Sequence, residues 1–158
     1  MTKDDVLVRK ADLDDAEYIT NFNLELAEQT ERKRLERGSV LEGVKAVIRD
    51  KSKGFYLVAE KRGAKSEVVG QLMITFEWSD WRNKYYWWLQ SVYIRKEHRN
   101  SRIFHRIYSE LIKIAESRRN VYALRLYVDK NNKHAKEVYG ALGMTKTAYE
   151  VYESHLNT

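Results

Sequence analysis

Hydrophobic and polar positions recur along this chain with two periods, one typical of strands and one typical of helices. Residues 6–11, VLVRKA, alternate between apolar and polar as a short strand does. Apolar residues at helical spacing then predict two helices, over residues 14–30 and 40–49. Asp12 and Ser39 are the expected N-caps of these helices.

Three strands are predicted in the middle of the chain. Residues 55–61 and 67–78 form a predicted hairpin that turns around Gly63. Residues 85–94, YYWWLQSVYI, are apolar or aromatic at almost every position. This run predicts a central strand that is buried on both faces.

The last third of the chain returns to helical spacing. A helix is predicted over residues 103–117, then a strand over 123–128 and a helix over 131–142 that Gly143 ends. Residues 148–153, AYEVYE, read as a closing strand. The order β-α-α-β-β-β-α-β-α-β predicts an α/β fold, a mixed sheet with flanking helices.

Composition narrows the class of protein. The length of 158 residues suits one domain over residues 1–158. The chain has no Cys, so it has neither a disulfide framework nor thiol chemistry. No apolar run approaches the roughly 18 residues of a membrane span, and the start MTKDDVLVRK lacks the apolar core of a secretion signal. We therefore expect a cytoplasmic protein without a membrane partner.

The net charge of +6 permits a polyanionic partner, but acidic residues are mixed among the basic ones. This pattern favours a solvated surface with one local anion site. A nucleic-acid interface is the alternative for a local group of basic residues, Arg95, Lys96, Arg99, Arg102 and Arg106. No nucleic-acid-reading motif accompanies them, so no nucleic acid is expected. The four His residues have no metal-ligand spacing, and no metal is expected.

Two segments are candidates for chemistry. HRNSRIFHRIY, residues 98–108, joins a predicted strand to a predicted helix, where phosphate-binding loops occur, but it contains no glycine. It reads either as an anion-binding helix N-terminus or as a basic helix start. Asn132, Ala135 and Tyr139 share one helical face. Spacing alone favours a buried structural Tyr139, and the alternative uses its hydroxyl as a proton donor.

These segments resemble the GNAT N-acetyltransferase superfamily. NNKHAKEVYGALGM is similar to its N-x-x-A-x-x-x-Y-x-x-x-G-F/M pattern, with matches at Asn132, Ala135, Tyr139, Gly143 and Met144. VYIRKEHRNSRIF is similar to V-x-V-x-x-x-x-R/Q-x-x-G-x-G/A, with matches at Val92, Ile94 and Arg99. The resemblance covers residues 5–153 and implies a GNAT-like, mostly antiparallel sheet with helices on both faces.

The resemblance implies transfer of an acetyl group from acetyl-CoA to a primary amine of a small molecule. It places the pantetheine arm along Val92, Tyr93 and Ile94. The pyrophosphate would bind the following turn, formed by Arg99, Asn100, Ser101, Arg102, Ile103 and Phe104, with Asn100 or Ser101 as N-cap. Tyr139 would protonate the departing CoA thiolate, and Asn132 is a predicted cofactor-binding residue that would act as a hydrogen-bond partner. The family often dimerises, so a homodimer is a further expectation.

Arg102 and Phe104 stand where the family pattern has G-x-G/A. Backbone amides survive any substitution, and a loop that enters helical dihedrals need not take positive φ at every position. An Arg beside a polyphosphate is also electrostatically favourable, so we expect CoA binding to be retained. The alternative is a non-catalytic GNAT-like module that binds CoA or another anion.

The region WSDWRNKYYWWLQSVYI resembles that of diamine (spermidine/spermine-type) acetyltransferases, which suggests a polyamine-like acceptor or an amino metabolite. Where those enzymes carry an acidic pair, this chain has Gln90 and Ser91, neither of which is a base at neutral pH. Glu77 is the predicted base, and Asp80 or a water chain is the alternative. An aromatic cluster serves either as core packing or as the lining for a cationic amine substrate. Its residues are Trp78, Trp81, Tyr85, Tyr86, Trp87 and Trp88.

Overall fold

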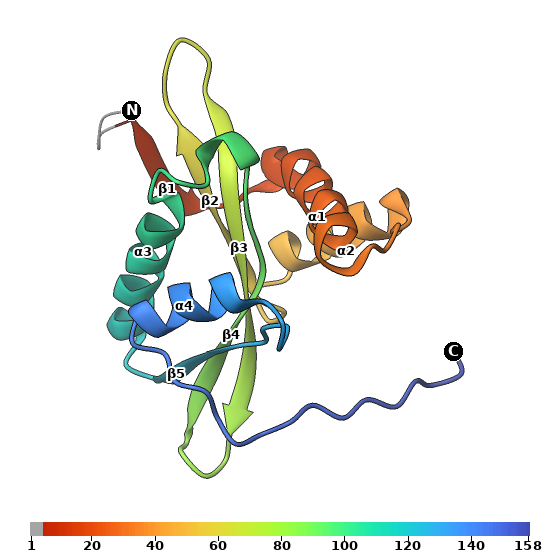
Figure 1. Cartoon of the computed structure of the whole chain (residues 1–158), viewed down its shortest axis with the longest axis vertical. Helices are drawn as coiled ribbons and strands as arrows, with labels where there is room; N and C mark the ends of the chain where they lie inside the picture. The colour runs from red at the N-terminus through yellow and green to blue at the C-terminus, as the bar shows by residue number, and fades with distance from the viewer. Residues whose placement is uncertain (1–4) are drawn as a thin grey trace. The chain divides into compact units, whose positions relative to one another are not determined.

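The computed structural model describes residues 5–158 (Figure 1). The chain divides into two compact units, the first ending at Leu126 and the second comprising Tyr127–Thr158. No helix within residues 5–158 is both long and apolar enough to cross a bilayer.

The first unit is built on a five-stranded sheet in the order β1-β2-β3-β4-β5. Its strands are β1 (Val6–Lys10), β2 (Phe55–Lys61), β3 (Glu67–Ser79), β4 (Lys84–Ile94) and β5 (Val121–Leu126). Neighbours pair antiparallel from β1 to β4, whereas β4 and β5 are parallel. This confirms the predicted mixed, mostly antiparallel sheet.

Helices cover both faces of this sheet, as predicted. The helices of the first unit are α1 (Ala16–Glu31), α2 (Arg37–Arg49) and α3 (Ile103–Arg118), with short 3₁₀ turns η1 (Leu13–Asp15) and η2 (Lys96–His98). Figure 1 shows α3 on one face and α1 with α2 on the other. Each face has its own apolar core: Ile107 and Leu111 of α3 are fully buried on one, and Ile19 of α1 on the other.

The cap of the first helical segment was predicted correctly and that of the second was not. Asp12 accepts a hydrogen bond from the amide of Asp14 and forms a capping box with Asp15. The second helix is capped by Glu36, not by Ser39. The Glu36 carboxylate reaches over one turn to accept from the amides of Gly38 (2.8 Å) and Ser39 (2.6 Å), so the helix starts earlier than predicted.

The prediction that residues 85–94 are buried on both faces was wrong. Only Trp87, Leu89 and Tyr93 of β4 are buried. Tyr93 is the one β4 residue in the core under α1 and α2. The aromatic rings nearer the β3–β4 turn, Tyr86 and Trp88, are therefore only partly covered.

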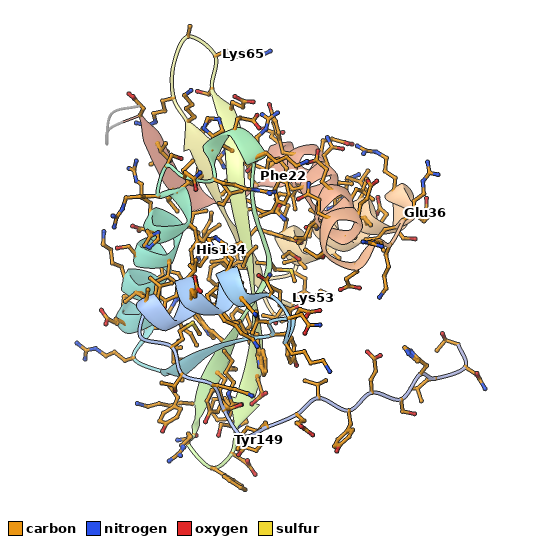
Figure 2. The ribbon with its side chains drawn as sticks, in the orientation of Figure 1. Phe22, Glu36, Lys53, Lys65, His134 and Tyr149 are labelled. Atoms are coloured by element: carbon orange, nitrogen blue, oxygen red, sulfur yellow. The ribbon has the colours of Figure 1, made fainter. Side chains whose placement is uncertain are left out.

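The second unit contains α4 (Lys133–Ala141) followed by an extended segment. The predicted closing strand over residues 148–153 was wrong, because no strand forms within residues 127–158. The alternation in AYEVYE suits a strand, but a strand needs a partner edge to satisfy its backbone. Tyr149, labelled in Figure 2, is 77% exposed in this segment.

Candidate active site

β4 separates from β5 midway along its length. The two strands pair from Tyr85↔Val121 to Leu89↔Leu126, where β5 ends. β4 continues to Ile94 and there pairs with β3 alone among the described strands. Val92, Tyr93 and Ile94, the predicted pantetheine-binding residues, lie on this single-paired stretch. The open edge of a strand offers amides and carbonyls to an extended ligand.

A β-bulge at Ser91 lies where the strands separate. Gln71 pairs with Tyr93 and Met73 pairs with Gln90, so Leu72 alone faces Ser91 and Val92. Ser91 has a φ of 51°, in the left-handed region. The extra residue reverses the alternation of side chains along β4. Leu89 before the bulge and Val92 after it consequently pack in the same core.

The turn between β4 and α3 differs from expectation at its cap. The N-cap of α3 is Arg102, which makes no side-chain capping bond. The prediction of Asn100 or Ser101 was wrong, since the Ser101 hydroxyl donates to the carbonyl of His98 one turn earlier. The first bond of the helix runs from the amide of Arg106 to the carbonyl of Arg102 (3.2 Å). The backbone amides of the first helical turn therefore precede the first hydrogen bond of the helix, as they do in anion-binding helix N-termini.

Arg102 stands where the family pattern has its first glycine, and it adopts a backbone conformation that glycine favours. Its φ and ψ are 61° and 20°, so the loop takes a positive φ at this position, although not at its neighbours Ser101 and Ile103. A side chain in this conformation costs about 1–2 kcal/mol relative to the right-handed one. The Arg102 side chain is exposed. The chain thus keeps the backbone geometry of a glycine turn while adding a cation to it.

Arg99, the matched cation of the family pattern, is engaged by the protein itself. Its Nε donates to the carbonyl of Ile94 (2.8 Å), and its Nη2 donates to Oε1 of Gln29 on α1 (2.9 Å). Its guanidinium lies over the Tyr93 ring, 5.4 Å from the centroid. Arg99 therefore ties the turn both to the end of β4 and to α1.

Tyr93 anchors β4 to α1. Its ring stacks on Phe22 with centroids 5.0 Å apart, and Phe22 projects from α1 toward the sheet in Figure 2. Its hydroxyl donates to the carboxylate of Glu25. Burial, followed by this contact with Glu25, raises the pKa of Tyr93. The hydroxyl therefore stays protonated at neutral pH and acts as a donor.

A groove of about 520 Å³ opens between α1 and the start of the turn. Its lining residues are Glu25, Glu28, Gln29, Tyr93, Arg95, Lys96 and Glu97. Arg95 is paired with Glu67 and with Glu97 (3.4 Å). The groove therefore offers carboxylates, a Lys ammonium and an aromatic ring beside the candidate pyrophosphate turn.

Glu77, the predicted base, lies on the sheet face that carries Gln90. Its Oε1 accepts from the indole of Trp88 (3.2 Å), and its Oε2 accepts from Arg125 (3.1 Å). The Arg125 guanidinium also lies 3.5 Å from the centroid of the Tyr86 ring. Each carboxylate oxygen keeps a further acceptor position. Asp80 lies in the exposed β3–β4 turn.

In the second unit, residues of the sequence pattern from Asn132 to Met144 cap α4 at both of its ends. The side chain of Asn132 caps the helix by accepting from the amide of Ala135 (3.0 Å). Gly143 takes a φ of 85°, and the amide of Met144 donates to the carbonyl of Tyr139 (3.1 Å). These bonds form an N-cap and a Schellman C-cap.

Tyr139 is the residue of this pattern whose hydroxyl is the candidate proton donor. Its side chain is half-buried on α4, and burial raises the pKa of Tyr139. The hydroxyl is therefore protonated at neutral pH, as an acid must be. Within residues 5–158, no three His, Asp or Glu side chains are grouped to hold a metal ion.

Comparison with known proteins extends these observations. The acetyltransferase (GNAT) family model matches residues 16–144. A possible acetyltransferase from Clostridium difficile 630 is 39% identical, with a TM-score of 0.89 over 97% of this chain and 99% of that one. A predicted acetyltransferase from Clostridium acetobutylicum, solved with acetyl-CoA, is 15% identical and has a TM-score of 0.76 over 94% of this chain and 96% of that one, which shows the shared fold.

A transcriptional regulator from Bacillus halodurans is 24% identical, with a TM-score of 0.77 over 96% of this chain and 99% of that one. The fold therefore occurs in proteins described by different functions. No curated protein matches the sequence significantly. The family model spans most of the chain, and the clostridial relative covers nearly all of it at substantial identity. The chain belongs to the GNAT family of acetyltransferases.

Proposed function

We propose that this protein transfers the acetyl group of acetyl-CoA to a primary amine of a small molecule. The observation that carries the proposal is the continuous course of β4 from its separation at Leu89, through the bulge at Ser91, into the N-terminus of α3. An open strand edge followed by a helix N-terminus suits a ligand with an amide-bearing arm and a pyrophosphate. Acetyl-CoA has both.

In this proposal the pantetheine arm pairs with the backbone of Val92, Tyr93 and Ile94. The pyrophosphate binds the turn from Arg99 to Phe104, where first-turn amides and the helix dipole favour an anion. Arg102 adds an exposed guanidinium at this point, and such a group forms charge-assisted hydrogen bonds with phosphate oxygens. Arg99 contributes by holding the turn, because its donors already contact Ile94 and Gln29.

The chemistry joins a neutral amine to the thioester carbonyl. The new C–N bond forms, the C–S bond breaks, and the acetyl group leaves CoA as an amide. The attacking nitrogen gives up one proton, and the departing thiolate takes one. Bound, aligned substrates supply a large part of such a rate enhancement. Tyr139 is the proposed donor to the thiolate, because it stands at the tyrosine position of the family pattern and its raised pKa keeps the hydroxyl protonated at neutral pH.

Glu77 is the proposed acceptor for the proton of the amine. It shares a sheet face with Gln90, and its carboxylate keeps acceptor capacity beyond Trp88 and Arg125. The aromatic rings of Tyr86 and Trp88 are partly exposed on the same face. Aromatic rings beside a carboxylate suit a cationic amine such as a polyamine-like acceptor or an amino metabolite.

The test has two parts. Titration calorimetry with acetyl-CoA should show saturable binding at micromolar concentrations, the usual range for such co-substrates. Release of the CoA thiol should then depend on one or more members of a panel of diamines, amino acids and amino sugars. Binding without release over the whole panel would favour the non-catalytic module, and no binding would contradict both interpretations.

A further inference from the structure

A buried amide lies directly beneath the β4 bulge. Gln71 on β3 is 0% exposed, and large polar side chains are seldom fully buried. Its Nε2 donates to the carbonyl of Ser91 (3.0 Å) and to Oδ1 of Asn23 on α1 (2.7 Å). Its Oε1 has no hydrogen-bond partner among the described residues. The buried position of Gln71 therefore depends on the two bonds made by its nitrogen.

The bond to Ser91 supports an unfavourable backbone conformation. Ser91 has no glycine-like freedom, yet its φ is 51°. At a bulge the extra residue is left outside the regular ladder, so its carbonyl needs a donor from elsewhere. Gln71 supplies that donor from the neighbouring strand. Asn23 fixes which end of the Gln71 amide faces Ser91, because its Oδ1 accepts from the same nitrogen.

The bulge sets the direction of the side chains in the last part of β4. By reversing the side-chain alternation it turns Tyr93 toward α1, where the ring meets Phe22 and the hydroxyl meets Glu25. Tyr93 in turn lies under the guanidinium of Arg99 in the candidate pyrophosphate turn. Gln71 is thus the first contact in a series that connects the strand separation to that turn.

We propose that Gln71 is a positioning residue for acetyl transfer. It holds the Ser91 carbonyl and thereby fixes the backbone of residues 90–92 at the point where β4 leaves β5. This inference rests on the proposed function, because the thioester would lie at that point. Gln71 itself is buried and acts through Ser91 without touching either substrate.

Gln71→Met tests the role, since Met fills a similar volume without a donor. We expect kcat to fall about tenfold to hundredfold, the loss that a small misplacement of reacting groups causes. The KM for acetyl-CoA should change less than kcat, because the turn at α3 keeps a contact that does not involve Gln71, from Arg99 to Gln29 on α1. Val44→Ala, in the buried core that α1 and α2 form against the sheet, provides a destabilised control. If Val44→Ala lowers Tm as much as Gln71→Met does, it should still keep the wild-type kcat.

Asn23 offers a second test with a conservative partner. Asn23→Asp keeps an oxygen that accepts from Gln71, whereas Asn23→Leu removes it. We expect the Asp variant to retain kcat near that of the wild type and the Leu variant to follow Gln71→Met. Equal kcat values in the two Asn23 variants would overturn the orienting role of Asn23.

Amide hydrogen exchange of the full chain provides a readout apart from turnover. Gln71→Met should lose protection at residues 90–92, and Val44→Ala should keep it. A Gln71→Met protein that matches Val44→Ala in both kcat and exchange would overturn this inference while leaving the proposed function intact. A wild-type protein that transfers no acetyl group, with the exchange difference present, would instead overturn the proposed function.

Discussion

Arg102 and Arg106 share the first hydrogen bond of α3, from the amide of Arg106 to the carbonyl of Arg102 at 3.2 Å. Arg102 adopts a left-handed conformation, and its side chain is exposed. The residue therefore combines two separable properties. One is backbone strain, and the other is a cation at the positive end of a helix dipole.

The strain can be measured by comparing two substitutions of Arg102. Arg102→Ala removes the cation and keeps the unfavourable φ, whereas Arg102→Gly removes both. We expect the Gly variant to be more stable than the Ala variant by about 1 kcal/mol, because Gly adopts positive φ without a steric penalty. Urea unfolding curves measure the difference. A Gly variant less stable than the Ala variant would contradict the conformation described for this turn.

The cation can be measured by the affinity for acetyl-CoA. Both Arg102 variants should bind acetyl-CoA about fivefold more weakly than the wild type at low salt, the equivalent of roughly 1 kcal/mol for an exposed charge pair. The difference should shrink at high ionic strength. Lys113→Ala, an exposed change of the same charge on α3, is the control. Tighter binding by the variants would show that Arg102 crowds the phosphate instead of pairing with it.

Arg99 should be intolerant of lysine. Arg99→Lys keeps the charge but cannot reproduce the separate bonds to Ile94 and Gln29. We therefore expect Arg99→Lys and Arg99→Ala to weaken acetyl-CoA binding to a similar degree, about tenfold for one or two lost charge-assisted bonds. Calorimetry gives the affinities. Full affinity in Arg99→Lys would mean that charge alone matters at this position.

Tyr139→Phe should separate binding from chemistry. Acetyl-CoA binding should match the wild type, and kcat should fall about a hundredfold, the lower end for a general acid. Because burial raises the pKa of Tyr139, the acid stays protonated beyond the ordinary tyrosine range and is lost only as the pH rises through the raised value. The Phe variant should lack that alkaline decline. An unchanged kcat would remove Tyr139 from the mechanism.

Glu77→Gln should reduce transfer with little loss of stability. The ion pair with Arg125 is partly exposed, so it contributes at most about 1 kcal/mol. A lost base should lower kcat/KM about a hundredfold at neutral pH. Asp80→Asn makes the same change of charge in the exposed β3–β4 turn and should leave kcat/KM unaltered. If Asp80→Asn has the larger effect, the base assignment moves to Asp80.

The sequence predicted those parts of the fold that depend on local periodicity. The strand at Phe55–Lys61 and the helix that begins at Ile103 follow from alternation and from an apolar stripe, which are properties of contiguous residues. The bulge at Ser91 carried no such signal. It is held by Gln71 and Asn23, which are distant in sequence, and it contains no glycine.

The same distinction applies to the candidate site. Gly143 was recognisable as a helix end because C-caps use particular residue types at fixed spacing, whereas Asn132, predicted as a hydrogen-bond partner, proves to be the N-cap of α4. The cap at Arg102 was missed because its left-handed φ is imposed by the turn against the preference of the residue. The closing strand was predicted from alternation alone, which does not supply the neighbouring edge that a strand needs.

Mass spectrometry of amines incubated with acetyl-CoA and the wild-type protein tests the proposed acetyl transfer most directly. We predict that a small primary amine gains one acetyl group, in an amount equal to the CoA thiol released. We also predict that Tyr139→Phe slows both equally. Saturable acetyl-CoA binding with no acetylated product from any amine of the panel would contradict the proposed transfer.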